Sequence, residues 1–101
     1  MQTQMFGNMI VERRLRNTSR AIRMLREESR IVEEQLDHLS SEASDLEIRS
    51  LVSETPLAAR EFEDAERHRL VMKSHVDRLR QQIVELERQQ DALLDRMGSR
   101  D

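Results

Sequence analysis

Two long runs of regularly spaced core-type residues constrain this chain more than any other feature. Over residues 11–46 and again over residues 62–97, the spacing steps by three and four without a break. The first run is Val11, Leu15, Thr18, Ile22, Leu25, Ser29, Val32, Leu36, Leu39, Ala43 and Leu46; the second is Phe62, Ala65, Arg69, Met72, Val76, Leu79, Ile83, Leu86, Gln90, Leu93 and Met97. This heptad spacing turns one seam of an α-helix toward a partner helix. The sequence therefore predicts two long helices.

The single proline separates the two runs and predicts a turn. Pro56 lacks a backbone N–H and has a fixed φ, so a helix arriving from Leu46 cannot continue through it unbroken. Thr55 is biased toward an extended backbone, which suits an N-cap residue, and Pro56 suits the first helical position. We expect helices over 9–52 and 56–97, joined by a turn over 53–55. The first helix follows an N-terminal tail over 1–8 and is capped by Asn8, and a C-terminal tail over 98–101 follows the second helix. Residues 9–97 then form one hairpin domain.

A constant sum of residue numbers aligns the two runs. Facing residues of an antiparallel hairpin share one sum, and here the value 108 matches all eleven layers. It places polar Thr18 opposite polar Gln90 and leaves one mismatch, Arg69 opposite Leu39. The layers run from Leu46–Phe62 at the turn through Ala43–Ala65, Leu36–Met72, Val32–Val76, Ser29–Leu79, Leu25–Ile83, Ile22–Leu86 and Leu15–Leu93 to Val11–Met97. We predict an all-α fold, an antiparallel two-helix coiled-coil hairpin.

The charges are segregated along the chain in a way that favours the same arrangement. Seven Arg and three Glu give residues 11–30 a charge of +4, whereas seven acids and one Arg give residues 31–54 a charge of −6. Residues 55–80 carry +1 and residues 81–101 carry −2. Antiparallel packing sets the +4 segment beside −2 and the −6 segment beside +1, although an exposed pair contributes only about 0.3–0.5 kcal/mol.

Composition excludes several functional classes. The chain is 37% charged and 2% aromatic and contains no cysteine, which favours an elongated helical protein and excludes disulfides and thiolate metal sites. No apolar run approaches the ~20 residues of a membrane span, and residues 1–10 lack the basic start of a signal peptide, so we expect a cytoplasmic protein without membrane contact. His38, His68 and His75 lack metal-ligand spacing, and no nucleophile, base and orienting group come together. We expect a non-enzymatic protein.

Two features besides the seam are candidate recognition surfaces. An arginine-rich run over residues 13–30 could follow a phosphate backbone, but the chain is acidic overall and lacks Trp and Tyr for base stacking. The arginine-rich run is therefore better explained as a solvated helix face, or as a binding surface for an acidic protein, than as a nucleic-acid site. Beside the seam lie surplus apolar residues: Ile10, Met24, Ile31, Leu70, Val84 and Leu94. They predict a homodimer packed as a four-helix bundle, or a groove for a partner helix.

Arg69 breaks the pattern of the second run and has two interpretations. Its stem can pack on the seam while the guanidinium reaches Asp64, Glu66 or an acid of the first helix. Alternatively, it recognises an anion or a partner carboxylate.

Several stretches resemble known families. Residues 51–58, 67–68 and 91–97, with 15–20, are similar to small coiled-coil hairpin proteins of actinobacteria. The second helix is also similar to antiparallel-helix anti-sigma factors under cyclic di-GMP control, whose motif is Glu-x3-Ser-x2-Arg-x3-Gln-x3-Asp. Arg69 and Asp77 match that motif, whereas Lys73, Glu66 and Phe62 replace its Gln, Ser and first Glu. This resemblance implies binding to a sigma factor and contacts from Arg69, Lys73 and Asp77 to cyclic di-GMP.

A second resemblance points to the tip of the hairpin. Residues 63–68, Glu-Asp-Ala-Glu-Arg-His, resemble the run after the tip of transcript-cleavage factors, which insert an acidic coiled-coil tip into RNA polymerase. The resemblance implies that Asp45, Glu47 and Glu54 are tip acids. We therefore expect a protein-binding module of bacterial transcription regulation, with a cyclic-dinucleotide switch and a polymerase-channel factor as alternatives.

Overall fold

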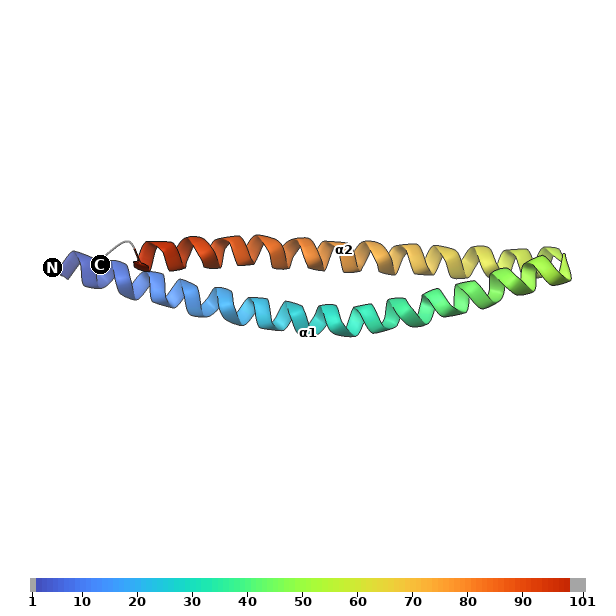
Figure 1. The fold of residues 1–101 in the computed structure, drawn as a ribbon, viewed down its shortest axis with the longest axis horizontal. Coiled ribbons are helices and arrows are strands. Elements are labelled where there is room, and N and C mark those ends of the chain that lie inside the picture. The colour runs from blue at the N-terminus through green and yellow to red at the C-terminus, as the bar shows by residue number, and fades with distance from the viewer. Residues whose placement is uncertain (1, 99–101) are drawn as a thin grey trace. The chain divides into compact units, whose positions relative to one another are not determined.

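Two α-helices make up the described part of the chain, and they form an all-α helical hairpin. The computed structural model describes residues 2–98, with side chains described from Gly7 onwards. Helix α1 spans Gln2–Ser53 and helix α2 spans Pro56–Gly98, so Glu54 and Thr55 form the turn between them (Figure 1). The predicted fold class is confirmed.

The helix boundaries differ from the predicted ones, most clearly at the start. The predicted tail over 1–8 and the cap at Asn8 are wrong, because α1 already runs from Gln2 through Gly7 and Asn8. A glycine inside a helix costs only about 1 kcal/mol, which the long helix on either side can absorb. Ser53 belongs to α1 rather than to the turn, and Gly98 is the last residue of α2. Met1 and residues 99–101 lie outside the described residues.

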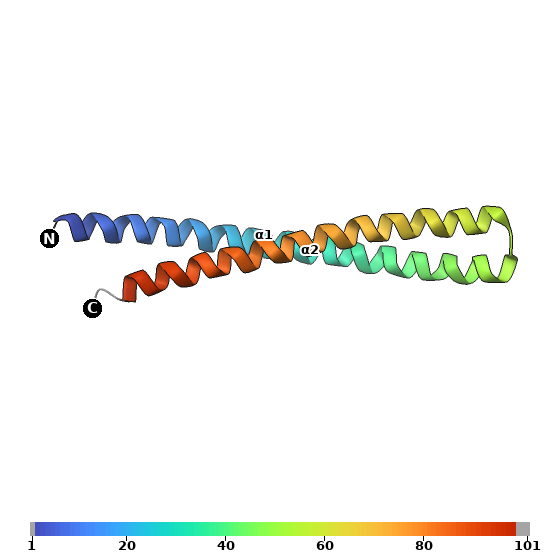
Figure 2. The same ribbon diagram turned by 90° about the horizontal axis from the view of Figure 1, so that it is seen from above.

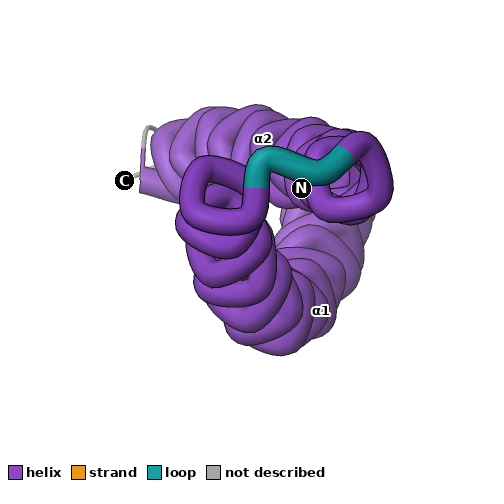
Figure 3. The backbone as a smooth tube through the Cα atoms, turned by 90° about the vertical axis from the view of Figure 1, so that its right-hand side faces the viewer, coloured by secondary structure: helices purple, strands orange, loops and turns teal. Residues whose placement is uncertain are grey.

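Figure 3 shows the turn between the helices in teal, and a helix cap lies on each side of it. The Ala58 N–H donates to Thr55 Oγ1 at 3.2 Å, and the Ala59 N–H donates to the Thr55 carbonyl at 3.1 Å, which confirms Thr55 as the N-cap of α2. At the end of α1, Glu54 has a φ of 52°, and its N–H donates to the Ser50 carbonyl at 3.1 Å. This is the left-handed C-terminal cap that glycine usually provides.

The chain divides into two compact units, which are described separately. One unit comprises Ser29–Arg78 and contains the turn; the other comprises residues up to Glu28 together with those from Leu79 onwards. Within each unit a segment of α1 packs against an antiparallel segment of α2 (Figure 2).

The turn unit has a narrow core built largely from small side chains. Its buried apolar residues are Val32, Ala43, Ala58, Ala65 and Val76, each at most 8% exposed. Ala58 is buried and Ser50 is half-buried, and their numbers also sum to 108, so the seam extends one layer closer to the turn than predicted. Alanines fit here because a two-residue connection holds the helix ends together.

The other unit combines an apolar core with one polar layer. Val11 and Ile22 are 1% and 2% exposed, and Leu79 and Leu93 are also buried. Gln90 Nε2 donates to Ser19 Oγ at 3.0 Å. The predicted polar layer therefore exists, but the long Gln90 side chain reaches the hydroxyl next to Thr18. Across both units, every predicted seam residue is buried or half-buried.

Candidate functional site

The six apolar residues predicted to flank the seam are all exposed. Their exposed fractions range from 44% for Ile31 to 68% for Met24. Ile10, Met24 and Ile31 share one heptad position on α1, and we call them the α1 stripe. Leu70 and Val84 share a position on α2, and Leu94 lies at a different one. The α1 stripe is therefore the most regular part of the predicted association surface.

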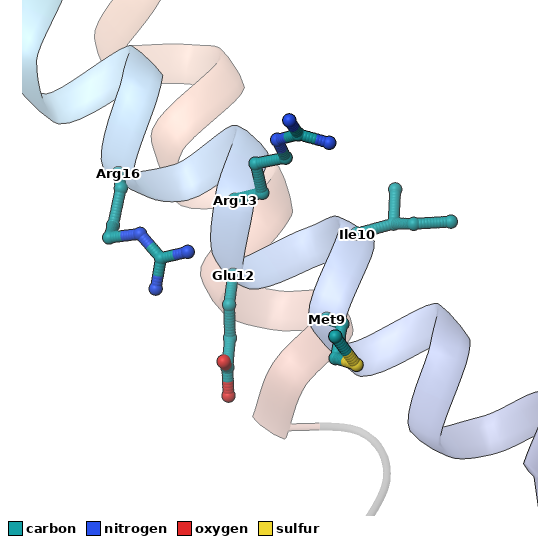
Figure 4. A pocket seen from close by; sticks show the side chains of 5 residues that line it. All are labelled: Met9, Ile10, Glu12, Arg13 and Arg16. Carbon is teal, nitrogen blue, oxygen red and sulfur yellow. The ribbon is translucent and has the colours of Figure 1, made fainter.

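Two hollows accompany the α1 stripe. The first, of about 340 Å³, is lined by Met9, Ile10, Glu12, Arg13 and Arg16 (Figure 4). Met9 and Ile10 are 61% and 53% exposed, so the hollow combines apolar surface with two guanidinium groups and one carboxylate. We call it the arginine-rimmed hollow. The second hollow, of about 560 Å³, lies in the turn unit and is lined by Ile31, Glu34, Gln35, His38, Leu39 and Met72.

Arg69, the mismatched residue of the seam, forms a two-pronged ion pair within α2. Its Nε donates to Glu66 Oε2 at 3.0 Å, and its Nη2 donates to Glu66 Oε1. These hydrogen bonds lower the pKa of Glu66 and raise the pKa of Arg69, against the opposing effect of desolvation on each group. A hollow of about 300 Å³ beside Arg69 is lined by Ser40, Ala43, Ser44, Glu47 and Glu66. An anion entering there would meet two carboxylates as well as the guanidinium.

The other two residues implied as cyclic di-GMP contacts pair with each other. Lys73 Nζ donates to Asp77 Oδ2 at 3.1 Å, and both side chains are about half exposed. Like Arg69 with Glu66, this pair lies along α2 itself, at a spacing of four residues. The three residues therefore share one helix, and each cation among them has a carboxylate partner.

The tip of the hairpin carries the predicted acids and an apolar group that the sequence analysis did not single out. Asp45, Glu47 and Glu54 are exposed. Around the same turn, Ile48, Leu51, Val52 and Leu57 are 62–79% exposed, and we call these four residues the apolar tip. The sequence could have predicted this group, because residues 48, 51, 52 and 57 are large, apolar and outside the seam spacing.

Other site types find little support within residues 2–98. No group of three or more His, Cys, Asp or Glu residues there is placed to hold a metal ion. His38 and His68 are exposed, and His75 is half-buried. None of the helices in this part of the chain is both long enough and apolar enough to cross a membrane.

Comparison with known proteins returned no relative. No family model, no curated protein and no solved structure matches this chain.

Proposed function

We propose that this chain is a non-enzymatic protein-binding module that forms a homodimer through the α1 stripe and acts in bacterial transcription regulation. The supporting observation is the contrast between the two sets of apolar residues on α1. The seam residues are buried or half-buried, whereas Ile10, Met24 and Ile31 remain 44–68% exposed at regular heptad spacing. Regular apolar exposure of this kind marks an association surface.

The charge pattern of α1 favours a second copy of the chain as the occupant of this surface. Residues 11–30 carry +4 and residues 31–54 carry −6. Two α1 helices packed antiparallel would set the basic half of each against the acidic half of the other. Parallel packing would instead oppose like charges, which is destabilising.

The role in transcription rests on the two resemblances. The similarity to anti-sigma factors favours a sigma factor as the regulated partner, and the exposed acids at the tip are compatible with RNA polymerase as the alternative. A cyclic-dinucleotide switch has less support, because Glu66 and Asp77 already engage Arg69 and Lys73.

Sedimentation equilibrium tests the homodimer. We expect the native chain to be dimeric at micromolar concentration and a Met24→Gln/Ile31→Gln variant to dissociate at least tenfold more readily. The matched control is Val71→Gln, because Val71 is 70% exposed and lies outside the predicted stripe. A monomeric native chain up to 100 µM would refute self-association.

Surface plasmon resonance with purified sigma factors and core RNA polymerase tests the regulatory role. Binding to one of them at micromolar concentration or tighter is expected. If neither class of protein binds the immobilised chain, the assignment to transcription is wrong even when the homodimer is present.

A further inference from the structure

The apolar tip is an exposed surface that the hairpin does not use for its own folding. Val52 is 79% exposed, Leu51 70%, Leu57 67% and Ile48 62%, and these values exceed those of most of the flanking residues. The layer beneath them is occupied by Ser50 and Ala58, which are half-buried and buried. The larger side chains therefore point away from the seam.

Three of the four residues share one face of α1, and the fourth lies at the start of α2. Ile48, Leu51 and Val52 follow the i, i+3, i+4 spacing that places side chains on one face of the last turns of α1. Leu57 is the second residue of α2, directly beyond the two-residue turn. A cluster of large apolar side chains at a hairpin end presents a compact surface for docking.

The charges around the apolar tip define what can cover it. Residues 45–63 contain five acids (Asp45, Glu47, Glu54, Glu61 and Glu63) against Arg49 and Arg60, a balance of −3. The complementary surface has an apolar floor and a cationic rim. An anionic membrane surface is disfavoured, because its headgroups carry the same sign of charge as the tip.

The arginine-rimmed hollow has this complementary chemistry. Met9 and Ile10 supply exposed apolar surface, and Arg13 and Arg16 supply the positive charge, with Glu12 the single acid (Figure 4). We infer that the apolar tip of one copy docks on the arginine-rimmed hollow of a second copy. This inference rests on the proposed homodimer and adds the tip and the hollow to the α1 stripe as parts of its interface.

The hollow and the apolar tip belong to opposite ends of the α1 sequence. The hollow belongs to residues 9–16, near the start of Gln2–Ser53, and the apolar tip belongs chiefly to its last turns. Two-fold symmetry between the copies pairs the tip of each with the hollow of the other. The interface then contains the same contact twice, so both tips and both hollows are occupied.

A charge exchange between the two surfaces tests the inference. The hollow variant is Arg13→Glu/Arg16→Glu, and the tip variant is Asp45→Arg/Glu47→Arg; all four positions are exposed. Each variant alone should dimerise at least tenfold more weakly than the native chain, because both contacts become repulsive. An equimolar mixture should recover a 1:1 heterodimer, since both contacts in it join opposite charges. Circular dichroism confirms that each variant remains helical.

The outcomes of this experiment separate the inference from the proposed homodimer. If the single variants dimerise like the native chain, the homodimer stands and the tip-to-hollow contact is refuted. If both variants weaken dimerisation but the mixture does not recover it, the charges act without facing each other, and the contact is again refuted. A native chain that is monomeric overturns both proposals.

An uncharged substitution tests the apolar part of the contact. Leu51→Gln should weaken dimerisation about tenfold or more, whereas Val71→Gln, at an equally exposed position of 70%, should leave it unchanged. Equal effects of the two substitutions would refute the role of the tip. Vesicles of phosphatidylcholine with one quarter phosphatidylglycerol supply the competing occupant: binding that Leu51→Gln abolishes, with dimerisation intact, would assign the tip to membranes and overturn the inference.

Discussion

Glu54 holds a backbone conformation that its side chain disfavours, and replacing it with glycine should stabilise the hairpin. Its φ of 52° lies in the left-handed region, where the Cβ atom of an L-residue crowds its own carbonyl oxygen. The surrounding caps maintain this conformation, because the Glu54 N–H bonds to the Ser50 carbonyl at 3.1 Å and Thr55 caps the next helix. Glu54→Gly should preserve both caps while it removes the Cβ atom.

The size of the effect follows from two opposing free energies. Relief of the left-handed strain is worth about 1–2 kcal/mol. The greater conformational freedom of glycine in the unfolded chain lowers the stability of the folded state by about 0.5–1 kcal/mol. The net gain is about 0.5–1 kcal/mol, or roughly 2–8 °C in Tm for a chain of this size. Loss of the carboxylate contributes little, because it lies at the unfavourable C-terminal end of α1 and close to the favourable N-terminal end of α2.

Thermal unfolding followed by circular dichroism at 222 nm measures this gain. All variants need one fixed protein concentration, since association would make the Tm depend on concentration. Glu54→Ala is the matched control, because it removes the charge but keeps the Cβ atom, so its Tm should remain close to that of the native chain. A Glu54→Gly variant that unfolds at or below the Tm of Glu54→Ala would show that the strain argument is incorrect.

Two further residues give predictions that need only unfolding curves. Thr55→Ala should lower the free energy of unfolding by about 1 kcal/mol through loss of the N-cap, whereas Thr55→Ser should retain most of it; equal losses in urea denaturation would contradict this. The lowered pKa of Glu66 means that its pairing with Arg69 stabilises the fold above the ordinary carboxyl pKa of 4.5, and that this contribution is lost as pH falls through the lowered value. Glu66→Gln should therefore be less stable than the native chain at pH 7 and differ less from it at pH 2; an unchanged difference at the two pH values would refute the linkage.

The heptad spacing predicted the seam residue by residue, because burying one stripe of each helix is the dominant requirement on such a chain. The residues at the turn predicted its position, because Pro56 cannot continue α1 and Thr55 suits a cap. The helix start was missed because the seam sets no limit on how far a helix extends beyond its first core residue, Val11. The conformation of Glu54 was missed because glutamate has no preference for positive φ and is held there by its neighbours.

The candidate sites were less accessible to sequence reasoning. The spacing of residues 66 and 69 allowed an ion pair but did not select Glu66 over Asp64 as the partner of Arg69. Exposure of the apolar tip depends on which side of α1 faces α2 at its last turn, and the predicted seam stopped at Leu46. Extending the heptad spacing of the seam to residues 50 and 58 would have predicted that the apolar tip is exposed.

The hydrogen bond from Gln90 to Ser19 has a consequence for how the helices recognise each other. Sliding α2 by one heptad would keep the repeat but set the Gln90 amide against Val11 or Leu25, where a buried donor without a partner costs about 1–3 kcal/mol. This layer therefore selects the alignment independently of the covalent connection. Helices α1 and α2, prepared as two separate peptides, should therefore associate in the native alignment. The hairpin can then be reconstituted from its two helices.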